Sequence, residues 1–168
     1  SIHSTQITIF IIPILYYCIM ENVVIIRYGE IALKGKNRRM FERKLVENIH
    51  RSMEKRGITV DCKIRHGRIL VYGGVIDVLS KLPGVVSLSP AIELSYAEIK
   101  PLLMKVLGKK GKKRFRVSAK RLYKGFEKTS MEINAEIGKH VVDTLGWKVD
   151  LENPEVDIGI EVMKEHCY

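Results

Sequence analysis

The chain has 168 residues, of which 46% are hydrophobic, an ordinary fraction for a globular protein. Its length allows one compact domain or two small ones, and its composition excludes disorder as the main state. The formal net charge is +10, from 29 Lys and Arg against 19 Asp and Glu. A surface with this charge attracts polyanions, so nucleic acid is the leading class of partner.

The three cysteines, Cys18, Cys62 and Cys167, are odd in number and far apart, and no C-x-x-C pair occurs. This spacing argues against a disulfide framework and against a zinc site, so we expect no bound metal. A reducing, cytoplasmic compartment is the default expectation.

The first twenty residues contain the apolar run ITIFIIPILYYCIM, from Ile7 to Met20. Fourteen residues interrupted by Pro13 fall short of the roughly twenty that span a bilayer, so we expect no membrane partner. Because MENVVIIRYGE reads like a natural start, we expect residues 1–19 to be an apolar extension of non-native origin. The alternative is an extra strand or an apolar helix docked on the domain.

Residues 20–92 carry the pattern of a first domain. A β-branched run, Val23 to Ile26, predicts a buried strand, and residues 37–56 repeat apolar positions every four residues after the plausible N-cap Asn37. Alternation on both sides of the pair His66-Gly67 predicts a hairpin, and a short helix and a strand follow. The order β-α-β-β-α-β is that of a small ferredoxin-like domain.

The pattern pauses at residues 90–93, and residues 93–168 read as a second α/β domain. Ser95 and Glu98 form a capping box before a helix that Pro101 should kink or delay. The strand RFRVSAK follows, with Phe115 inward and Arg116 outward. A second capping box at Thr129 starts a helix that runs to Gly146, and a half-buried strand covers residues 156–162. We therefore expect an α+β protein of two domains.

The basic charge is concentrated in two segments. Ten Lys and Arg lie between Lys109 and Lys128 against one acid, and seven lie between Arg27 and Lys44 against two acids. From Thr129 onward nine acids stand against three lysines. Two basic patches backed by an acidic segment are typical of a nucleic-acid-binding surface, although a solvated charged face is the alternative.

Catalytic motifs are missing from the sequence. We find no phosphate-binding P-loop, no ATP pyrophosphatase loop, no nucleophile elbow and no zinc-protease motif, so we expect no catalytic centre and no cofactor in this chain. The loop RYGEIALKGKNRR leads from a strand to a helix N-terminus and could hold a nucleic-acid phosphate or be a simple tight turn. The stretch KKRFRVSAKRLYKGF places cations beside aromatic side chains that can stack on unpaired bases.

Two long strings carry a family resemblance. RYGEIALKGKNRRMFERKLVENI resembles the N-terminal ferredoxin-like domain of the tRNA 4-thiouridine synthetase family, a group of sulfur-transfer proteins also linked to thiamine biosynthesis. RFRVSAKRLYKGFEKTSMEINAEIGKHVVD, followed by VDLENPEVDIGIEV, is similar to the THUMP domain of that family.

The resemblance implies that both domains grip the acceptor arm of tRNA and that THUMP reads the single-stranded CCA end. It also implies a separate ATP pyrophosphatase domain, in cis or in trans, and a sulfur donor such as a cysteine desulfurase. ATP would be the cofactor of that separate domain only, since the sequence stops at Tyr168, where the domain would begin.

The family pattern places two strips of tRNA contacts on this chain, which we expect to form one continuous basic surface. The first strip consists of Lys34, Lys36, Asn37, Arg38 and Arg39. The second consists of Arg116, Lys120, Arg121, Lys124, Phe126, Ser130 and Asn134. Two alternatives remain: a THUMP subunit of another RNA-modifying enzyme, such as a methyltransferase or pseudouridine synthase, and an interaction domain for acidic proteins or membrane surfaces.

Overall fold

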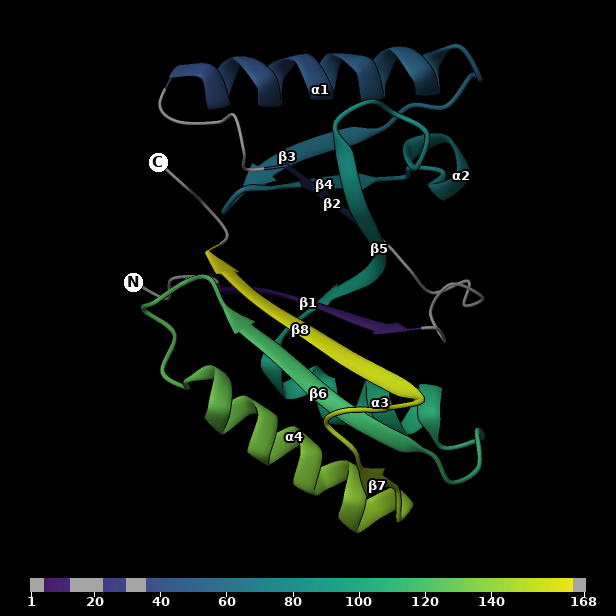
Figure 1. Cartoon of the computed structure of the whole chain (residues 1–168), viewed down its shortest axis with the longest axis vertical. Coiled ribbons are helices and arrows are strands. Elements are labelled where there is room, and N and C mark those ends of the chain that lie inside the picture. Colours follow the sequence, from purple (N-terminus) through teal and green to yellow (C-terminus); the bar gives the residue numbers. More distant parts are fainter. Residues whose placement is uncertain (1–4, 13–22, 30–35, 165–168) are drawn as a thin grey trace. The chain divides into compact units, whose positions relative to one another are not determined.

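The structure is a computed structural model that describes residues 5–12, 23–29 and 36–164 (Figure 1). The chain divides into two compact units. One unit is Glu21–Ala91, which we call the inserted unit, and the other combines Ser1–Met20 with Ile92–Tyr168, which we call the outer unit. The outer unit is therefore built from both sides of the inserted one.

The inserted unit is an antiparallel sheet with a long helix across one face (Figure 1). Its elements are β2 (Val23–Tyr28), α1 (Lys36–Glu54), β3 (Asp61–Arg65), β4 (Arg68–Tyr72), α2 (Ile76–Leu79) and the first part of β5 (Val85–Leu94). The strands lie in the order β3-β4-β2-β5, and each neighbouring pair is antiparallel. This confirms the ferredoxin-like order that the sequence predicts.

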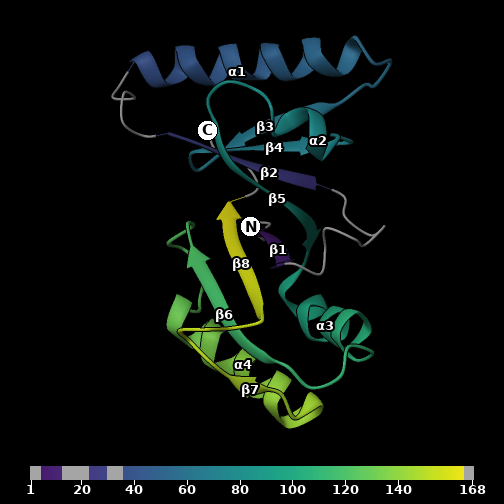
Figure 2. The same cartoon turned by 45° about the vertical axis from the view of Figure 1, so that its right-hand side comes forward.

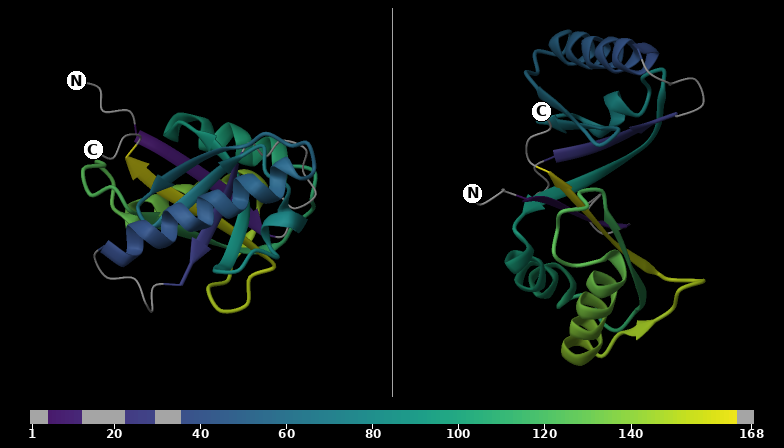
Figure 3. Two further views of the ribbon diagram at one scale, coloured as in Figure 1. Left: turned by 90° about the horizontal axis from the view of Figure 1, so that it is seen from above. Right: turned by 90° about the vertical axis from the view of Figure 1, so that its left-hand side faces the viewer.

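Helix α1 lies along one face of the inserted sheet (Figure 3), and it packs there through the apolar positions that recur every four residues. Leu45, Ile49 and Met53 are at most 2% exposed and share a core with Val24 and Ile26 of β2. The helix begins at Lys36, so Asn37 lies inside its first turn and is not the N-cap that we predicted.

The predicted hairpin turn is also present. β3 and β4 pair up to Arg65 opposite Arg68, and the two residues between them, His66 and Gly67, have φ angles of 45° and 74°. Positive φ at both central residues is typical of the tight turn whose twist suits an antiparallel hairpin.

The outer unit is a mixed sheet covered on one face by two helices (Figure 2). Its elements are β1 (Thr5–Ile12), the end of β5, the 3₁₀ turn η2 (Tyr96–Glu98), α3 (Ile99–Leu107), β6 (Arg114–Arg121), α4 (Ser130–Leu145), β7 (Lys148–Val149) and β8 (Val156–Lys164). The strand order is β5-β1-β8-β6-β7, with β6 parallel to β7 and β8. Phe115, Ile133 and Ile158 are fully buried in its core.

Strand β1 differs from the expected extension. Its alternate residues Ile7, Ile9 and Ile11 are at most 1% exposed, and the strand pairs with β5 and with β8. Residues 5–12 therefore follow the alternative of an extra strand, because alternate isoleucines suit a strand with one face in a core. The apolar composition of the segment hid this period in the sequence.

Strand β5 corrects the predicted pause at residues 90–93. The strand runs without a break through Pro90, which lies opposite Val24 of β2, and Ile92 then lies opposite Ile9 of β1. Proline has no N–H group to donate to a neighbouring strand. Here it lies at the point where β5 stops pairing with β2 and begins to pair with β1.

Both capping boxes are confirmed. Ser95 and Glu98 bond reciprocally, but their box opens the 3₁₀ turn, so α3 begins at Ile99 and Pro101 falls in its first turn. Thr129 and Glu132 cap α4, which ends at Gly146 with a φ of 65°. In the described part of the chain, no helix is both long and apolar enough to cross a bilayer.

Candidate nucleic-acid interface

The first strip lies at the beginning of α1. Lys34 and the side chain of Lys36 lie outside the described residues, while Asn37, Arg38 and Arg39 are exposed in the first turn. Two arginines therefore belong to the first turn of a helix, an end at which the helix dipole favours an anion.

Arg38 is held by a buried carboxylate. Its Nε donates to Oε1 of Glu42 at 3.0 Å, and the hydroxyl of Tyr28 donates to the same oxygen. Glu42 is only 7% exposed, so this carboxylate needs both donors. Burial, followed by the hydrogen bond to Glu42, raises the pKa of Tyr28 above its usual range, which keeps the tyrosine a donor. Arg38 is thus fixed in direction before any ligand arrives.

The second strip centres on the loop between β6 and α4. The amide of Arg121 donates to Oγ of Ser130 at 3.1 Å, and the amide of Ala119 donates to Oδ1 of Asn134 at 2.9 Å. Ser130 and Asn134 therefore use their side-chain oxygens to satisfy backbone amides of β6. The guanidinium of Arg121 adds a bond to the carbonyl of Phe126 at 3.3 Å, which closes the loop.

The loop leaves its lysines in solvent and folds its phenylalanine inward. Lys120 and Lys124 are exposed, and both can reach an external phosphate. Phe126 is half-buried, and its ring centroid lies 5.6 Å from that of Tyr96. The ring that we predict to stack on a base is therefore also part of the packing of the unit.

Arg116 differs from the exposed lysines of the second strip because an acid already binds it. Its Nε and Nη2 donate to Oδ2 of Asp157 at 3.0 and 2.8 Å, and Ser118 donates to Oδ1 at 2.8 Å. By strand parity Arg116, Ser118 and Lys120 share the face of β6 opposite to the inward Phe115. Its Nη1 also donates to the carbonyl of Leu151 at 3.3 Å, and a guanidinium bound at all three nitrogens is a weaker candidate for RNA than the exposed lysines.

Sequence reasoning missed a polar cluster around Glu136 that anchors the loop. Glu136 accepts from Tyr96 Oη at 2.8 Å and from Lys128 Nζ at 2.9 Å, and Lys100 Nζ lies 3.1 Å from its other oxygen. The bond from Lys128 is the main reason that the pKa of Glu136 falls to about 2. Tyr96 and Lys100 lie in one segment and Lys128 in another, distant one, so no local signal in the sequence could have joined all three to Glu136.

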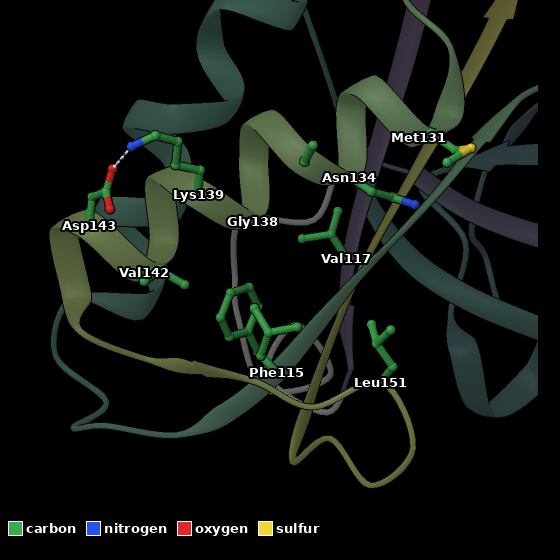
Figure 4. Close-up of a pocket in the computed structure, with 11 residues that line it drawn as sticks. Phe115, Val117, Met131, Asn134, Gly138, Lys139, Val142, Asp143 and Leu151 are labelled. Carbon is green, nitrogen blue, oxygen red and sulfur yellow. Dashed lines mark hydrogen bonds and ion pairs between the residues drawn. The ribbon is translucent and has the colours of Figure 1, made fainter.

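An apolar groove lies beside Asn134, between α4 and the strands β6 and β7 (Figure 4). It measures about 510 Å³, and Figure 4 shows Met131, Asn134 and Val142 on the helix facing Val117 and Leu151. Among the described residues, four of the seven exposed large hydrophobic side chains line it: Met131, Val142, Val149 and Leu151. The sequence pattern did not single out these residues, because each alone reads as an ordinary surface position.

The described residues contain no group of three or more His, Cys, Asp or Glu side chains that could hold a metal ion. What the arrangement offers chemically is exposed cations in the first turn of α1 and at the end of β6 and its following loop, with apolar walls in the groove beside α4. These groups suit binding of a polyanion with exposed bases.

Comparison with known families gives two matches in the order that the fold displays. Residues 23–89 match the ThiI ferredoxin-like domain, and residues 96–168 match the THUMP domain. The two matches fall on the inserted unit and on the larger part of the outer unit.

Curated relatives agree with these matches. The chain is 37% identical over 161 residues to a probable tRNA sulfurtransferase of Methanocaldococcus jannaschii, a match covering 86% of this chain and 42% of that protein. It is 40% identical over 157 residues to one of Alkaliphilus oremlandii, covering 85% of this chain and 40% of that protein. The chain thus spans about two fifths of the length of these relatives.

Solved structures are similar as well. A crystal structure of a protein from Pyrococcus horikoshii is 32% identical, with a TM-score of 0.72 over 86% of this chain and 54% of that one. A 4-thiouridine synthetase solved in complex with RNA and bound ATP is also 32% identical, with a TM-score of 0.66 over 86% of this chain and 40% of that one.

Proposed function

Since the chain belongs to the tRNA sulfurtransferase family, as a ThiI ferredoxin-like domain followed by a THUMP domain, we propose that it is a tRNA-binding module. The observation that carries the proposal is the closed loop between β6 and α4. The end of β6 and this loop leave Lys120 and Lys124 exposed, and their charges can bind RNA phosphates. The solved RNA complex of a similar protein supports RNA as the polyanion.

The finer proposal concerns what each strip holds. The first strip tracks phosphates of the acceptor arm through Arg38 and Arg39, and the second strip holds the single-stranded CCA end. The groove beside Asn134 supports this division, because its apolar walls can cover the face of an unpaired base. The bound arm would present a uridine for sulfur transfer. We assign ATP-dependent activation to the part of the relatives' length that this chain does not span.

The test is a filter-binding titration of an unmodified tRNA transcript against the whole chain. Lys120→Ala with Lys124→Ala should weaken binding about tenfold or more at 0.15 M salt and lower the slope of log K against log salt by about two. The matched control is Lys105→Ala with Lys148→Ala, which removes two exposed lysines of the same unit that belong neither to the second strip nor to the groove.

The same titration separates the two strips. A transcript lacking its single-stranded 3′ end should bind the native chain more weakly, yet lose little further affinity when Lys120 and Lys124 are replaced. Equal affinity of the native chain and the Lys120 and Lys124 variant for the full transcript would remove the second strip from the proposal.

A further inference from the structure

In the described part of the chain, β3 is an edge strand, because it stands at one end of the strand order and pairs only with β4. Arg65 and Arg68 flank the two-residue turn, and such a pair exchanges both of its backbone hydrogen bonds. Since this pattern alternates along a strand, the backbone N–H and C=O groups of Cys62 and Ile64 point to the open side. The carbonyl of Ile64 accepts from Nη1 of Arg65 at 3.0 Å, which agrees with this direction. β3 therefore presents backbone donors and acceptors with which no described strand pairs.

A groove of about 470 Å³ follows this open edge. Arg43, Val46 and Glu47 of α1 line one side of it, and residues 62–65 of β3 line the other. Consecutive residues of a strand point to opposite faces of the sheet, so an unbroken run of them places the groove around the edge and not over one face. The groove thus gives room beside β3 for another extended chain.

The two faces that meet at this edge differ in chemistry. On the side of α1, Val46, Cys62 and Ile64 are half-buried and pack against the core of the inserted unit. Burial, and then the charge of Asp61, raises the pKa of the Cys62 thiol to about 11, so the thiol stays neutral near neutral pH and packs as an apolar group. Lys63 points to the other face and is exposed. A strand beside β3 would therefore meet apolar groups with every second residue and a cation with the residues between.

The charge at the groove favours an acidic partner. Arg43 and Lys63 are exposed cations. Glu47, the acid that lines the groove, has its own partner, because Nζ of Lys44 lies 3.7 Å from its Oε2. The ammonium of Lys63 lies 5.0 Å from the centroid of the Tyr72 ring, and a cation over a ring can still donate to a carboxylate.

A protein strand fits this edge better than RNA does. Phosphate oxygens only accept hydrogen bonds, so RNA would leave the outward carbonyl groups of β3 without donors. An extended peptide both donates and accepts along its length, and its alternate side chains can reach the apolar side of the groove.

We propose that the open edge of β3, with its groove, is a docking site for an extended segment of a partner protein in which apolar and acidic residues alternate. The segment adds a strand beside β3, so that its backbone pairs with the outward groups of Cys62 and Ile64. Its apolar residues face Val46, and its acidic residues lie beside Lys63. The proposal goes beyond RNA binding, because it gives the inserted unit a protein partner at a surface outside both strips.

The probe is the fluorescein-labelled peptide Glu-Val-Glu-Ile-Glu-Val-Glu, and fluorescence anisotropy follows its binding to the whole chain at about 0.15 M salt. The native chain should bind it with a Kd of about 0.1 mM or tighter. Because a net charge of +10 attracts any acidic peptide, the control is a peptide of the same composition without alternation, Glu-Glu-Glu-Glu-Val-Ile-Val. This control should bind about tenfold more weakly. Equal affinity for the two peptides would overturn the proposal.

Methylation of peptide nitrogens tests the pairing of the two backbones. The N–H groups of alternate residues in a strand point to opposite edges, so only one alternate set can pair with β3. One modified probe is N-methylated at its valines and isoleucine, and the other at its interior glutamates. One of the two should lose binding and the other should keep it. Equal affinities of the two modified probes would show that the backbone of β3 is not used, which also overturns the proposal.

Lys63→Glu reverses the charge beside the added strand and keeps the backbone bonds to β4. It should lower the affinity for the alternating acidic peptide about tenfold or more, and it should let the peptide Lys-Val-Lys-Ile-Lys-Val-Lys bind in its place. Binding of the lysine peptide also shows that the variant is folded. The matched control, Lys55→Glu, changes an exposed lysine of the same unit outside the groove and should bind the acidic peptide like the native chain. Equal loss of acidic-peptide affinity in both variants would count against the site.

Titration with the tRNA transcript separates a protein partner from RNA at this surface. Lys63→Glu and Lys55→Glu should weaken tRNA binding equally, because each changes the net charge by the same amount. A larger loss with Lys63→Glu, together with a native chain that does not bind the acidic peptide, would assign the edge of β3 to RNA. That result would overturn the docking site and leave the proposed function intact.

Discussion

At the scale of single residues, several side chains chosen as RNA contacts also hold the protein together. Asn134 and Ser130 each satisfy a β6 amide, and Arg121 closes the loop onto Phe126. Leaving a buried amide without its acceptor costs about 1–3 kcal/mol. Alanine at these positions therefore tests packing and binding together, whereas Lys120 and Lys124 report on binding alone.

Glu136 gives a pH prediction at this scale. Its pKa of about 2 lies below the ordinary 4.5, so its contribution to stability is complete above about pH 4.5 and is lost as the pH falls toward 2. Glu136→Gln should lower the free energy of unfolding at pH 7 and flatten its dependence on pH between 4.5 and 2. Urea unfolding at a series of pH values measures both effects.

The control for this prediction is Glu127→Gln, at an exposed glutamate in the loop that precedes α4. A Glu136 variant that keeps the native pH dependence across this window would show that the bonds from Lys128 and Tyr96 do not stabilise the fold.

At the scale of elements, the structure makes β1 part of a core. Ile9 is fully buried, and its strand lies between β5 and β8, so Ile9→Ala should lower the free energy of unfolding by about 2 to 5 kcal/mol. Leu151→Ala, at a side chain that is 69% exposed, should change it by about 0.5 kcal/mol or less. Denaturant unfolding measures the free energy of unfolding of both variants. Equal values would show that residues 5–12 are not part of the core and form only an extension.

Elements with a strong period could be predicted from the sequence, and those without one could not. The four-residue stripe of Leu45 and Ile49 and the capping box at Thr129 gave α1 and α4 nearly to the residue. Strand β1 escaped because its neighbours are as apolar as its buried isoleucines, and β7 escaped because two residues carry no pattern. The full length of strand β5 was not predicted, because a proline usually marks the end of a strand. Only the structure shows that β5 continues past Pro90 with a new partner strand.

The candidate site was predictable in its charge and not in its contacts. The basic clusters around Arg38 and Lys120 can be predicted from the sequence, because charges that are neighbours in the chain are close together in any fold. Which acid or amide each side chain meets depends on pairing between distant segments, as with Arg116 and Asp157.

At the scale of the whole molecule, the net charge of +10 attracts any polyanion, so preference among polyanions is the informative measurement. We expect a preformed complex with tRNA to survive an excess of phosphatidylserine vesicles, because the arginines of the first strip and the groove beside Asn134 offer fitted contacts in addition to charge. Fluorescence anisotropy of labelled tRNA during vesicle titration follows the competition. Complete displacement at equal charge would favour the reading of a membrane-surface or acidic-protein binder.

The pairing of β1 with β8 has a consequence for how the chain matures. Thr5 lies opposite Lys164, so the sheet of the outer unit joins residues at opposite extremes of the described chain. During synthesis Glu21–Ala91 can fold as soon as it emerges, whereas β1 cannot pair with β8 until residues 156–164 have been made. A ribosome-bound intermediate would therefore contain a folded ferredoxin-like domain and an unpaired apolar strand β1. This exposed strand is the part of the intermediate that a chaperone would bind most readily.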